Sequence, residues 1–357
     1  MADTINLMII DDSALVRQTF CQVFDSTSDI SVVAVAPDPF IAVEKLKKHV
    51  PDVILLDVEM PKMDGVTFLK KLMAQHPIPV VICSTLVGNR SETHMAALEA
   101  GAVDIIAKPS VGIKTYAAES SQRLCDAIRA ASKAKVRQLK RVVRENKKQN
   151  ADAVLSRSSR PAMHETTDKI LCIGASTGGT EAIKAVLMSM PVDCPAIAIV
   201  QHMPEGFTRS FAERLNALCP ITVREAEKGM SMLRGQAIIA PGNMHMTIKR
   251  SGARYYVDVA DGPLVSRHRP SVDVLMRSAA NIAGKNAAAV ILTGMGDDGA
   301  AGLKEMRDAG ARTFAQDEKT SVVWGMPRVA TESGAAQANV ALERVASVLL
   351  EAVSYGR

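Results

Sequence analysis

The sequence predicts two α/β domains in tandem, each a mostly parallel β-sheet with helices on both faces. Three observations lead to this fold class. The length of 357 residues suits about two domains. In both halves, apolar runs of strand length alternate with amphipathic stretches of helical period, which is the order expected for a parallel sheet. A polar, basic segment near the middle of the chain interrupts both patterns and separates the halves.

The composition argues against several classes of protein. No apolar run reaches the roughly 18 residues of a membrane span, and the N-terminus lacks the basic start of a signal peptide. The six cysteines are scattered without a CxxC pair, which is typical of reduced thiols in the cytoplasm. Aromatic residues make up only 3% of the chain, so platforms for base stacking are not expected. We therefore expect a cytoplasmic protein without membrane insertion and without a nucleic-acid partner.

The first predicted domain covers residues 1–125. Its strand-like runs are 6–10, 31–36, 53–57, 80–83 and 103–107. Ligands of parallel α/β sheets bind beyond the carboxyl ends of the strands. The residues at these ends are acids, a hydroxyl and a cation: Asp11 and Asp12 after the first strand, Asp57 after the third, Ser84 after the fourth and Lys108 after the fifth.

These side chains suit the transfer of a phosphoryl group. Three carboxylates at one edge repel one another unless a cation lies among them, and hard oxygen ligands favour Mg²⁺. A lysine and a hydroxyl beside them would neutralise and hydrogen-bond a phosphoryl group. Asp57 is the expected acceptor because it lies centrally. The alternative is that each acid merely caps a helix or a turn, which is common for a single acid. It is not expected when three acids, a hydroxyl and a lysine stand together at the ends of strands in one sheet.

The elements DD, DVEMPKMDG and KP closely resemble the receiver domain of bacterial response regulators, a flavodoxin-like fold with a five-stranded parallel sheet. This resemblance implies phosphorylation of Asp57 by a histidine kinase, Mg²⁺ held by Asp11, Asp12 and Asp57, and switching through Ser84 and Lys108. One departure is Ile105, which stands where many receivers carry Tyr or Phe. Signalling by an aromatic side chain that swings inward is therefore not expected.

Residues 126–168 form the predicted connector. Apolar residues at helical spacing continue to Val143, which indicates that the last helix of the first domain extends into the basic stretch. After Asn146 no apolar period remains, and we expect a flexible linker. Between Lys133 and Arg160, ten Lys or Arg residues stand against two acids, in a chain whose net charge is +5. Basicity confined to one segment favours a solvated tether; docking on an acidic partner is the alternative.

The second predicted domain, residues 169–357, opens on the segment KILCIGASTGGTE. A short apolar strand at 170–173 breaks through glycines into a helix that begins at Thr180. Such a turn places Ser176 at the carboxyl edge of the sheet, where the first N–H groups of a helix favour negative charge. Ser176 is therefore a candidate nucleophile. A plain tight turn or a phosphate-binding loop is the alternative.

The rest of this half has the pattern of a doubly wound sheet with an added β-hairpin. Further strands are expected at 196–201, 237–240, 287–293 and 312–315, the hairpin at 247–248 and 255–259, and helices at 180–190, 207–218, 272–283, 299–309 and 342–353.

Two more reactive side chains follow strands of this sheet. His202 ends the strand AIAIVQ, and Asp298 follows the strand in VILTGMGDDGA. If the three strand ends converge, His202 would deprotonate Ser176 and a carboxylate would orient the imidazole. The GxSxG elbow of the α/β-hydrolases is absent, and the order Ser…His…Asp differs from theirs. Spacing alone leaves three rivals: His245, His268 and Asp297.

Five segments of this half, GASTGG, QHMPEGFTRSFA, APGNMHM, HRPSVDVLM and LTGMGDDGA, resemble the CheB family of chemotaxis protein-glutamate methylesterases, in the same order. Together with the receiver elements they span nearly the whole chain except the connector. The resemblance implies that Ser176 is the nucleophile, His202 the base and Asp298 the orienting carboxylate, with Thr177 and Met295 in the same pocket.

The resemblance also implies the reaction. The expected activity is hydrolysis of glutamate γ-methyl esters on methyl-accepting chemoreceptors, with deamidation of particular receptor glutamines, and no cofactor for the esterase chemistry. The receiver is expected to mask the esterase until it is phosphorylated. Two readings from other classes remain open: a response regulator with a non-catalytic binding module, and a transcriptional regulator that uses the basic connector on DNA.

Overall fold

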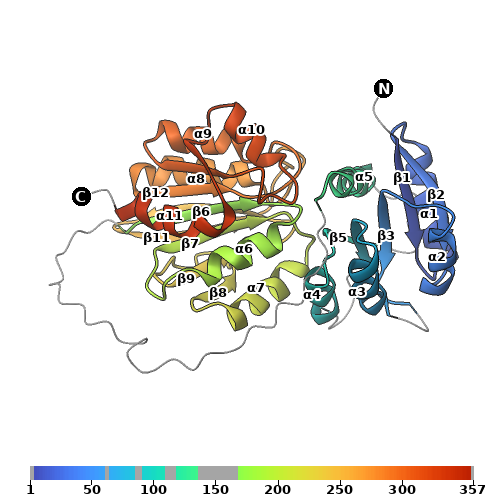
Figure 1. Cartoon of the computed structure of the whole chain (residues 1–357). Coiled ribbons are helices and arrows are strands. Elements are labelled where there is room, and N and C mark those ends of the chain that lie inside the picture. Colours follow the sequence, from blue (N-terminus) through green and yellow to red (C-terminus); the bar gives the residue numbers. More distant parts are fainter. Residues whose placement is uncertain (1–3, 61–63, 85–90, 109–117, 136–167, 355–357) are drawn as a thin grey trace.

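The computed structural model describes residues 4–60, 64–84, 91–108, 118–135 and 168–354. They form two α/β units, each built on its own parallel sheet (Figure 1). The predicted fold class is confirmed for both halves. All six cysteines are free thiols. No helix in the described part of the chain is long and apolar enough to cross a membrane.

The N-terminal sheet has five parallel strands in the order β2-β1-β3-β4-β5. The strands are β1 (Ile5–Ile10), β2 (Ile30–Ala36), β3 (Val53–Asp57), β4 (Val80–Ser84) and β5 (Asp104–Ala107). The connecting helices are α1 (Ala14–Asp25), α2 (Pro39–Leu46), α3 (Gly65–Gln75), α4 (Ser91–Glu99) and α5 (Ala118–Ser132).

Both faces of this sheet are covered because its central strands are apolar on both sides. Leu55 of β3 packs with α1 and α5 on one face. Its neighbour Leu56 packs with α2, α3 and α4 on the other. This continuous burial is typical of a parallel sheet between two helical layers. It leaves the carboxyl ends of the strands as the open edge.

The C-terminal sheet has seven parallel strands in the order β14-β13-β12-β6-β7-β9-β8. The strands are β6 (Ile170–Ala175), β7 (Ala196–Gln201), β8 (Thr222–Glu225), β9 (Gln236–Ile239), β12 (Ala287–Ile291), β13 (Arg312–Gln316) and β14 (Ala338–Val340). The helices are α6 (Gly179–Met188), α7 (Phe207–Leu218), α8 (Val272–Ile282), α9 (Ala300–Asp308), α10 (Met326–Glu332) and α11 (Val345–Ser354).

The predicted hairpin is confirmed as an antiparallel pair, β10 (His245–Ser251) and β11 (Arg254–Ala260). It packs with α8, α9 and α10 on one face of the large sheet. Helices α6, α7 and α11 cover the other face. The sequence prediction missed two edge strands, β8 and β14, and the short helix α10.

Helix α5 ends at Ser132, and residues 136–143 of the predicted helical extension lie outside the described residues. The N–H groups of Lys133 and Ala134 donate to the carbonyls three residues earlier, which tightens the end of the helix. The N–H of Lys135 donates to the carbonyl of Val322 in the C-terminal domain (3.2 Å). The backbone therefore leaves the helix to bond the other domain. The predicted linker lies almost wholly in residues 136–167, outside the described residues.

The two domains pack directly on each other. Helix α4 lies against α6 and α7 (Figure 1). One cluster of buried apolar side chains runs without a break from the α3–α4 face of the receiver-like sheet to the α6–α7 face of the large sheet. The residues after β6, at the carboxyl edge of the large sheet, also bond the N-terminal domain, from Thr177 to Asp104 and from Gly178 to Val103.

Candidate active site

The strand register brings Ser176 and His202 to the same level of the large sheet. Ala175 at the end of β6 pairs with Gln201 at the end of β7, so the next residue of each strand leaves the sheet side by side. The N–H of His202 donates to the carbonyl of Ala175 (3.1 Å), which continues the ladder by one step. On the other side of β6, the N–H of Ser176 donates to Thr293, beyond the end of β12 (3.0 Å).

Two glycines make this close approach possible. Gly178 has φ +77°, a conformation that favours glycine, and it allows the chain to turn from β6 into α6. Gly294 lies so close to Ser176 that an added Cβ would stand 2.8 Å from the serine Cβ. The turn that carries Ser176 and the loop that carries Asp298 are therefore packed backbone to side chain.

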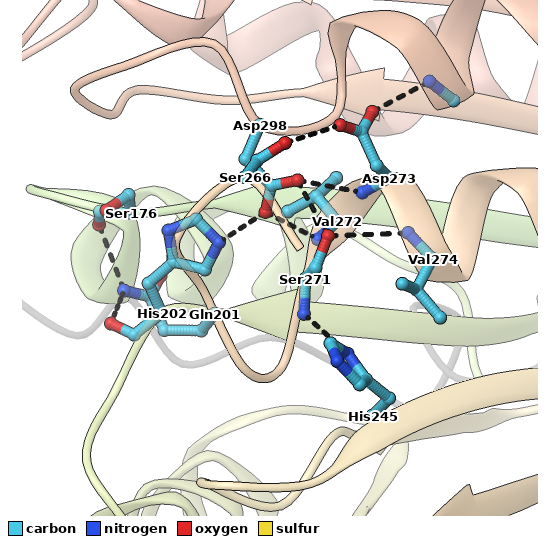
Figure 2. A network of polar contacts seen from close by, with 11 residues as sticks. Ser176, Gln201, His202, His245, Ser266, Ser271, Val272, Asp273, Val274 and Asp298 are labelled. Atoms are coloured by element: carbon cyan, nitrogen blue, oxygen red, sulfur yellow. Dashed lines mark hydrogen bonds and ion pairs between the residues drawn. The ribbon is translucent and has the colours of Figure 1, made fainter. Parts of the chain in front are cut away.

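His202 and Asp298 are in direct contact. The imidazole Nε2 lies 2.8 Å from Oδ2 of Asp298, and both side chains are almost completely buried (Figure 2). The carboxylate also accepts hydrogen bonds from the Ser271 hydroxyl (2.7 Å) and the N–H groups of Val272 (2.7 Å) and Asp273 (3.1 Å). These donors form the N-terminus of α8, where a helix stabilises negative charge.

This environment fixes the charge of the pair. Burial alone would raise the pKa of Asp298, but the hydrogen bonds from His202, Ser271 and Val272 lower it to about 2. Asp298 is thus an anion at neutral pH, and Nε2 of His202 is the donor of their hydrogen bond. The second ring nitrogen, Nδ1, lies on the side of the ring toward Ser176 in Figure 2.

The three rivals lie in other arrangements. Asp297 is exposed, whereas its neighbour Asp298 is 1% exposed and faces His202. His245 is engaged in backbone contacts, with Nε2 2.8 Å from the carbonyl of Pro263 and Nδ1 accepting from Ser271 (3.3 Å). His268 stacks on His202. The predicted set Ser176, His202 and Asp298 is brought to one edge.

Sequence reasoning missed Gln201, which ties the two strand ends together. Its side-chain amide donates to the carbonyls of Ser176 (3.0 Å) and His202 (3.1 Å), and the residue is 2% exposed (Figure 2). No sequence signal marks a glutamine at the end of an apolar strand. Ser271 was missed as well, although a serine before the helical run VDVLM is a recognisable N-cap.

Thr177 follows Ser176 directly, and Met295 follows Gly294, the residue that packs against Ser176. Within the described residues, the N–H groups of Thr177 and Met295 donate to no protein acceptor. Free N–H groups beside a nucleophile are the donors that an oxyanion needs. The side chain of Thr177 is buried and bonded to the N-terminal domain, while Met295 is half-buried.

The acids of the N-terminal domain converge as expected. Carboxylate oxygens of Asp11, Asp12 and Asp57 all lie within 4.8 Å of one another. Lys108 bridges two of them, with Nζ 2.8 Å from Asp11 and 2.5 Å from Asp57. Burial raises the pKa of Asp57 even though Lys108 donates to it, so the cluster still lacks positive charge. Three carboxylates around one ammonium fit a divalent cation with oxygen ligands.

Ser84 is engaged away from this cluster. Its hydroxyl lies 2.5 Å from Nε2 of His94 on α4, and both side chains are buried. The His94 ring in turn contacts Phe207 on α7, with ring centroids 4.7 Å apart. Ile105, where many receivers have an aromatic residue, is buried and lines a small cavity together with Ser176. Ser84, through His94, and Ile105 therefore border the domain interface, whereas the other predicted switch residue, Lys108, lies in the acidic cluster.

The N-terminal domain covers the candidate site. Asp104, at the start of β5, accepts a hydrogen bond from the hydroxyl of Thr177 (3.1 Å). The carbonyl of its neighbour Val103 accepts from the N–H of Gly178 (3.3 Å). Ser176 is 9% exposed as a result of this packing and that of its own domain. The site is closed in this conformation.

The fold and the site together define a response-regulator receiver joined to an α/β domain that carries a buried histidine–carboxylate pair beside a serine turn. Family models agree with each half: the response regulator receiver domain matches residues 7–116 and CheB methylesterase matches residues 171–349. The chain belongs to the CheB methylesterase family.

Relatives of the same two-domain length are similar throughout. The chain is 58% identical over 350 residues to protein-glutamate methylesterase/protein-glutamine glutaminase 3 of Geobacter metallireducens, covering 97% of this chain and 98% of the relative. It is 55% identical over 353 residues to the corresponding protein 2 of Oleidesulfovibrio alaskensis, covering 99% of both. The crystal structure of the Thermotoga maritima CheB methylesterase catalytic domain superposes with a TM-score of 0.51 at 36% identity, covering 52% of this chain and 98% of that one.

Proposed function

We propose that this chain hydrolyses glutamate γ-methyl esters on methyl-accepting chemoreceptors, using Ser176, His202 and Asp298 as a catalytic triad. The observation that carries the proposal is the 2.8 Å contact between His202 and ionised Asp298, one strand away from the Ser176 turn. A buried carboxylate is oriented to stabilise an imidazolium, which forms only when the imidazole removes a proton. The names of the similar proteins supply the substrate class.

Each residue has a defined part in the reaction. The ionised Asp298 accepts from Nε2, so Nδ1 of His202 keeps a lone pair for the serine proton. Ser176 attacks the ester carbonyl, and the N–H groups of Thr177 and Met295 bind the resulting oxyanion. His202 then returns the proton to the departing methoxide, which leaves as methanol. Water activated by the same imidazole hydrolyses the acyl-enzyme and restores the glutamate carboxylate.

The same groups deamidate receptor glutamines. Ser176 attacks the side-chain amide carbonyl, and His202 protonates the departing nitrogen, which leaves as ammonia. The protonated histidine matters more here, since an amine is a poorer leaving group than an alkoxide. This chemistry needs no cofactor in the C-terminal domain.

The receiver regulates access to the site. A histidine kinase supplies the phosphoryl group and Asp57 accepts it, with Asp11, Asp12 and Asp57 as the residues that hold Mg²⁺. When bound, Mg²⁺ supplies the positive charge that a buried carboxylate cluster and a phosphoryl group both need. Phosphorylation loosens the packing of α4 and β5 on the serine turn, the segment 176–183 that leads from β6 into α6. These partners are cytoplasmic, and the chain is expected in the same compartment.

The test is methanol release from methylated chemoreceptors, with and without a small phosphodonor in Mg²⁺. Ser176→Ala should lower turnover by about 10⁴-fold or more, by analogy with other serine triads. Asp57→Asn should keep the basal rate and lose activation by the phosphodonor. Deleting residues 1–145 should raise the basal rate. Near-normal turnover by Ser176→Ala would end the triad proposal, and a truncated enzyme no faster than the full chain would end the masking proposal.

A further inference from the structure

A second histidine lies flat against His202. The imidazole rings of His202 and His268 are stacked with centroids 3.7 Å apart and an angle of 9° between their planes. His268 comes from the loop between β11 and α8, far from His202 in sequence. Nothing in the reaction described above uses it. A parallel stack this close fixes the orientation of both rings, so the contact bears directly on the proposed base.

The loop holds His268 in place through its backbone. Val265 and His268 exchange two hydrogen bonds, from the Val265 N–H (3.1 Å) and the His268 N–H (2.9 Å). The two residues between them, Ser266 and Arg267, have φ of 51° and 67°, as the central residues of a type I′ turn do. The Ser266 hydroxyl also donates to Asp273 on α8 (3.0 Å). The ring is thus presented by a tightly closed turn anchored to the helix that binds Asp298.

The stack restrains a motion that the hydrogen bond to Asp298 leaves free. The Nε2–Oδ2 contact holds one atom of the His202 ring, but a small turn about the Cβ–Cγ bond can still tilt the ring plane while this contact is kept. Such a rotation would swing Nδ1 away from Ser176. A flat ring at 3.7 Å blocks it, because any tilt of the His202 plane brings the two rings into collision.

The charge state of His268 suits this task. Burial lowers the pKa of His268 to about 3, and the positive charges of His202, Arg123 and Arg267 act in the same direction, while Asp298 opposes them. His268 is therefore neutral at neutral pH. A neutral aromatic face stabilises a cation stacked on it, whereas a second imidazolium would repel the one that forms on His202 during proton transfer.

We propose that His268 is a positioning residue of the esterase: its neutral ring stacks on His202, holds Nδ1 on the side of the ring toward Ser176 and supports the imidazolium that forms there. The inference rests on the proposed role of His202 as the base. His268 touches neither ester nor leaving group in this account. Its contribution should appear in the rate of the chemical step and not in the binding of receptor.

The test compares three variants of the full chain, each activated by a small phosphodonor in Mg²⁺: His268→Ala, His268→Gln and His268→Phe. Phenylalanine keeps a flat aromatic face, glutamine keeps a polar side chain of similar reach without one, and alanine removes both. For His268→Ala and His268→Gln we expect kcat for methanol release to fall about 10- to 100-fold with KM within about twofold, the size of effect that small misalignments produce. His268→Phe should retain most of the wild-type kcat. The midpoint of the acid limb in its profile of kcat against pH should equal that of the wild type, since phenylalanine does not titrate.

The outcomes separate the proposal from its alternatives. Wild-type kcat in His268→Ala would overturn it, and so would an equal loss in His268→Phe and His268→Gln, because the aromatic face would then be irrelevant. Should His268→Ala fail to fold, the contrast between Phe and Gln decides the question, with thermal unfolding recorded for both. Ser176→Ala and His202→Ala are measured alongside as controls. Activity in either control would contradict the proposed triad. If both controls are inactive while His268→Ala is fully active, only the stacking role is contradicted.

Discussion

Asp104 of the receiver accepts a hydrogen bond from the hydroxyl of Thr177, the residue that follows Ser176. A carboxylate of the regulatory domain thereby lies at the serine turn itself and not merely near the mouth of the site. Burial raises the pKa of Asp104 to about 6, although hydrogen bonds from the Ile105 N–H and from Thr177 oppose the shift. An acid with a raised pKa at a domain contact makes the contact sensitive to pH.

The direction of this sensitivity follows from linkage. In an open protein Asp104 would titrate near its ordinary value of about 4, whereas in the closed protein it titrates at about 6, so closing takes up a proton between these values. Closure is therefore favoured as pH falls through 6 and opposed by the ionised carboxylate above it. We expect the serine turn, residues 176–183, to be better protected from amide hydrogen exchange at pH 5 than at pH 7.5 after correction for intrinsic rates.

Asp104→Asn provides the matched variant. Asparagine keeps an acceptor for Thr177 but carries no charge, so closure should become tighter at pH 7.5 and independent of pH. Basal methanol release at pH 7.5 should fall below that of the unmodified chain. Equal protection at both pH values in the unmodified protein, or unchanged protection in Asp104→Asn, would contradict the role given to this carboxylate.

A second interface contact joins Arg214 of α7 to Glu99 of α4, with Nη2 2.5 Å and Nε 3.0 Å from the same carboxylate oxygen. Partly exposed pairs of this kind contribute about 1 kcal/mol or less, so either charge reversal should raise the basal esterase rate only severalfold. Arg214→Glu combined with Glu99→Arg should return the rate toward the unmodified value, because the pair is restored with opposite polarity.

A pair within the C-terminal domain serves as the control. Arg277 on α8 and Glu305 on α9 are also in close contact and similarly exposed, but both belong to the C-terminal domain. Reversing them should leave basal methanol release unchanged. If Arg214→Glu behaves like Arg277→Glu, or if the double reversal at Arg214 and Glu99 fails to recover the low basal rate, α4 does not hold the site closed through this pair.

The sequence predicted most of the fold because strand and helix patterns are local. The two strands it missed, β8 and β14, are short edge strands of four and three residues, and exposed polar residues interrupt their apolar pattern. Ser176, His202 and an aspartate were expected at one edge because a parallel sheet brings successive carboxyl ends together, while the choice of Asp298 over Asp297 came from the family resemblance.

Contacts between segments with no fixed register could not be predicted. Asp104 meets Thr177, and His94 meets Phe207, only through the docking of two domains, and no spacing along the chain encodes that orientation. The stack of His268 on His202 depends on an irregular loop whose course is set by two residues with positive φ. Such a conformation is uncommon outside glycine, so the sequence gives no sign of it.

Asp298 offers a direct test of the proposed base. Asp298→Asn removes the charge that stabilises the imidazolium while keeping the size of the side chain, and we expect kcat to fall by about 10³- to 10⁴-fold. Because hydrogen bonds hold the pKa of Asp298 at about 2, the pair should persist until the pH falls toward that value. The acid limb of the pH profile should therefore not report the titration of Asp298.

The adjacent acid provides the control for this prediction. Asp297 is exposed at the start of the same turn, and Asp297→Asn makes the same chemical change one residue away. Its kcat should remain within about twofold of the unmodified enzyme, as surface substitutions usually do. Equal losses in the two variants would show that the turn tolerates no substitution, and would remove the case for Asp298 as the orienting carboxylate.

His94 connects the receiver switch to the esterase. Its Nε2 lies 2.5 Å from the Ser84 hydroxyl, and its ring contacts Phe207 at the start of α7. If Ser84 turns to bind a phosphoryl group on Asp57, it must give up this bond, and the restraint that the bond places on His94 against α7 is lost. The residue would then transmit the signal that Ile105 is not expected to carry.

His94→Phe separates the two contacts, since phenylalanine keeps a ring beside Phe207 but cannot bond Ser84. We expect phosphorylation of the chain at a normal rate, a basal esterase rate close to that of the unmodified protein, and activation by the phosphodonor reduced by about fivefold, a coupling of about 1 kcal/mol. His94→Ala removes both contacts and should raise the basal rate as well. His49→Phe, at an exposed position after α2, is the control and should leave both rates unchanged. Full activation of His94→Phe would show that the signal reaches α7 by another route, because the bond to Ser84 is the one contact this variant is designed to lose.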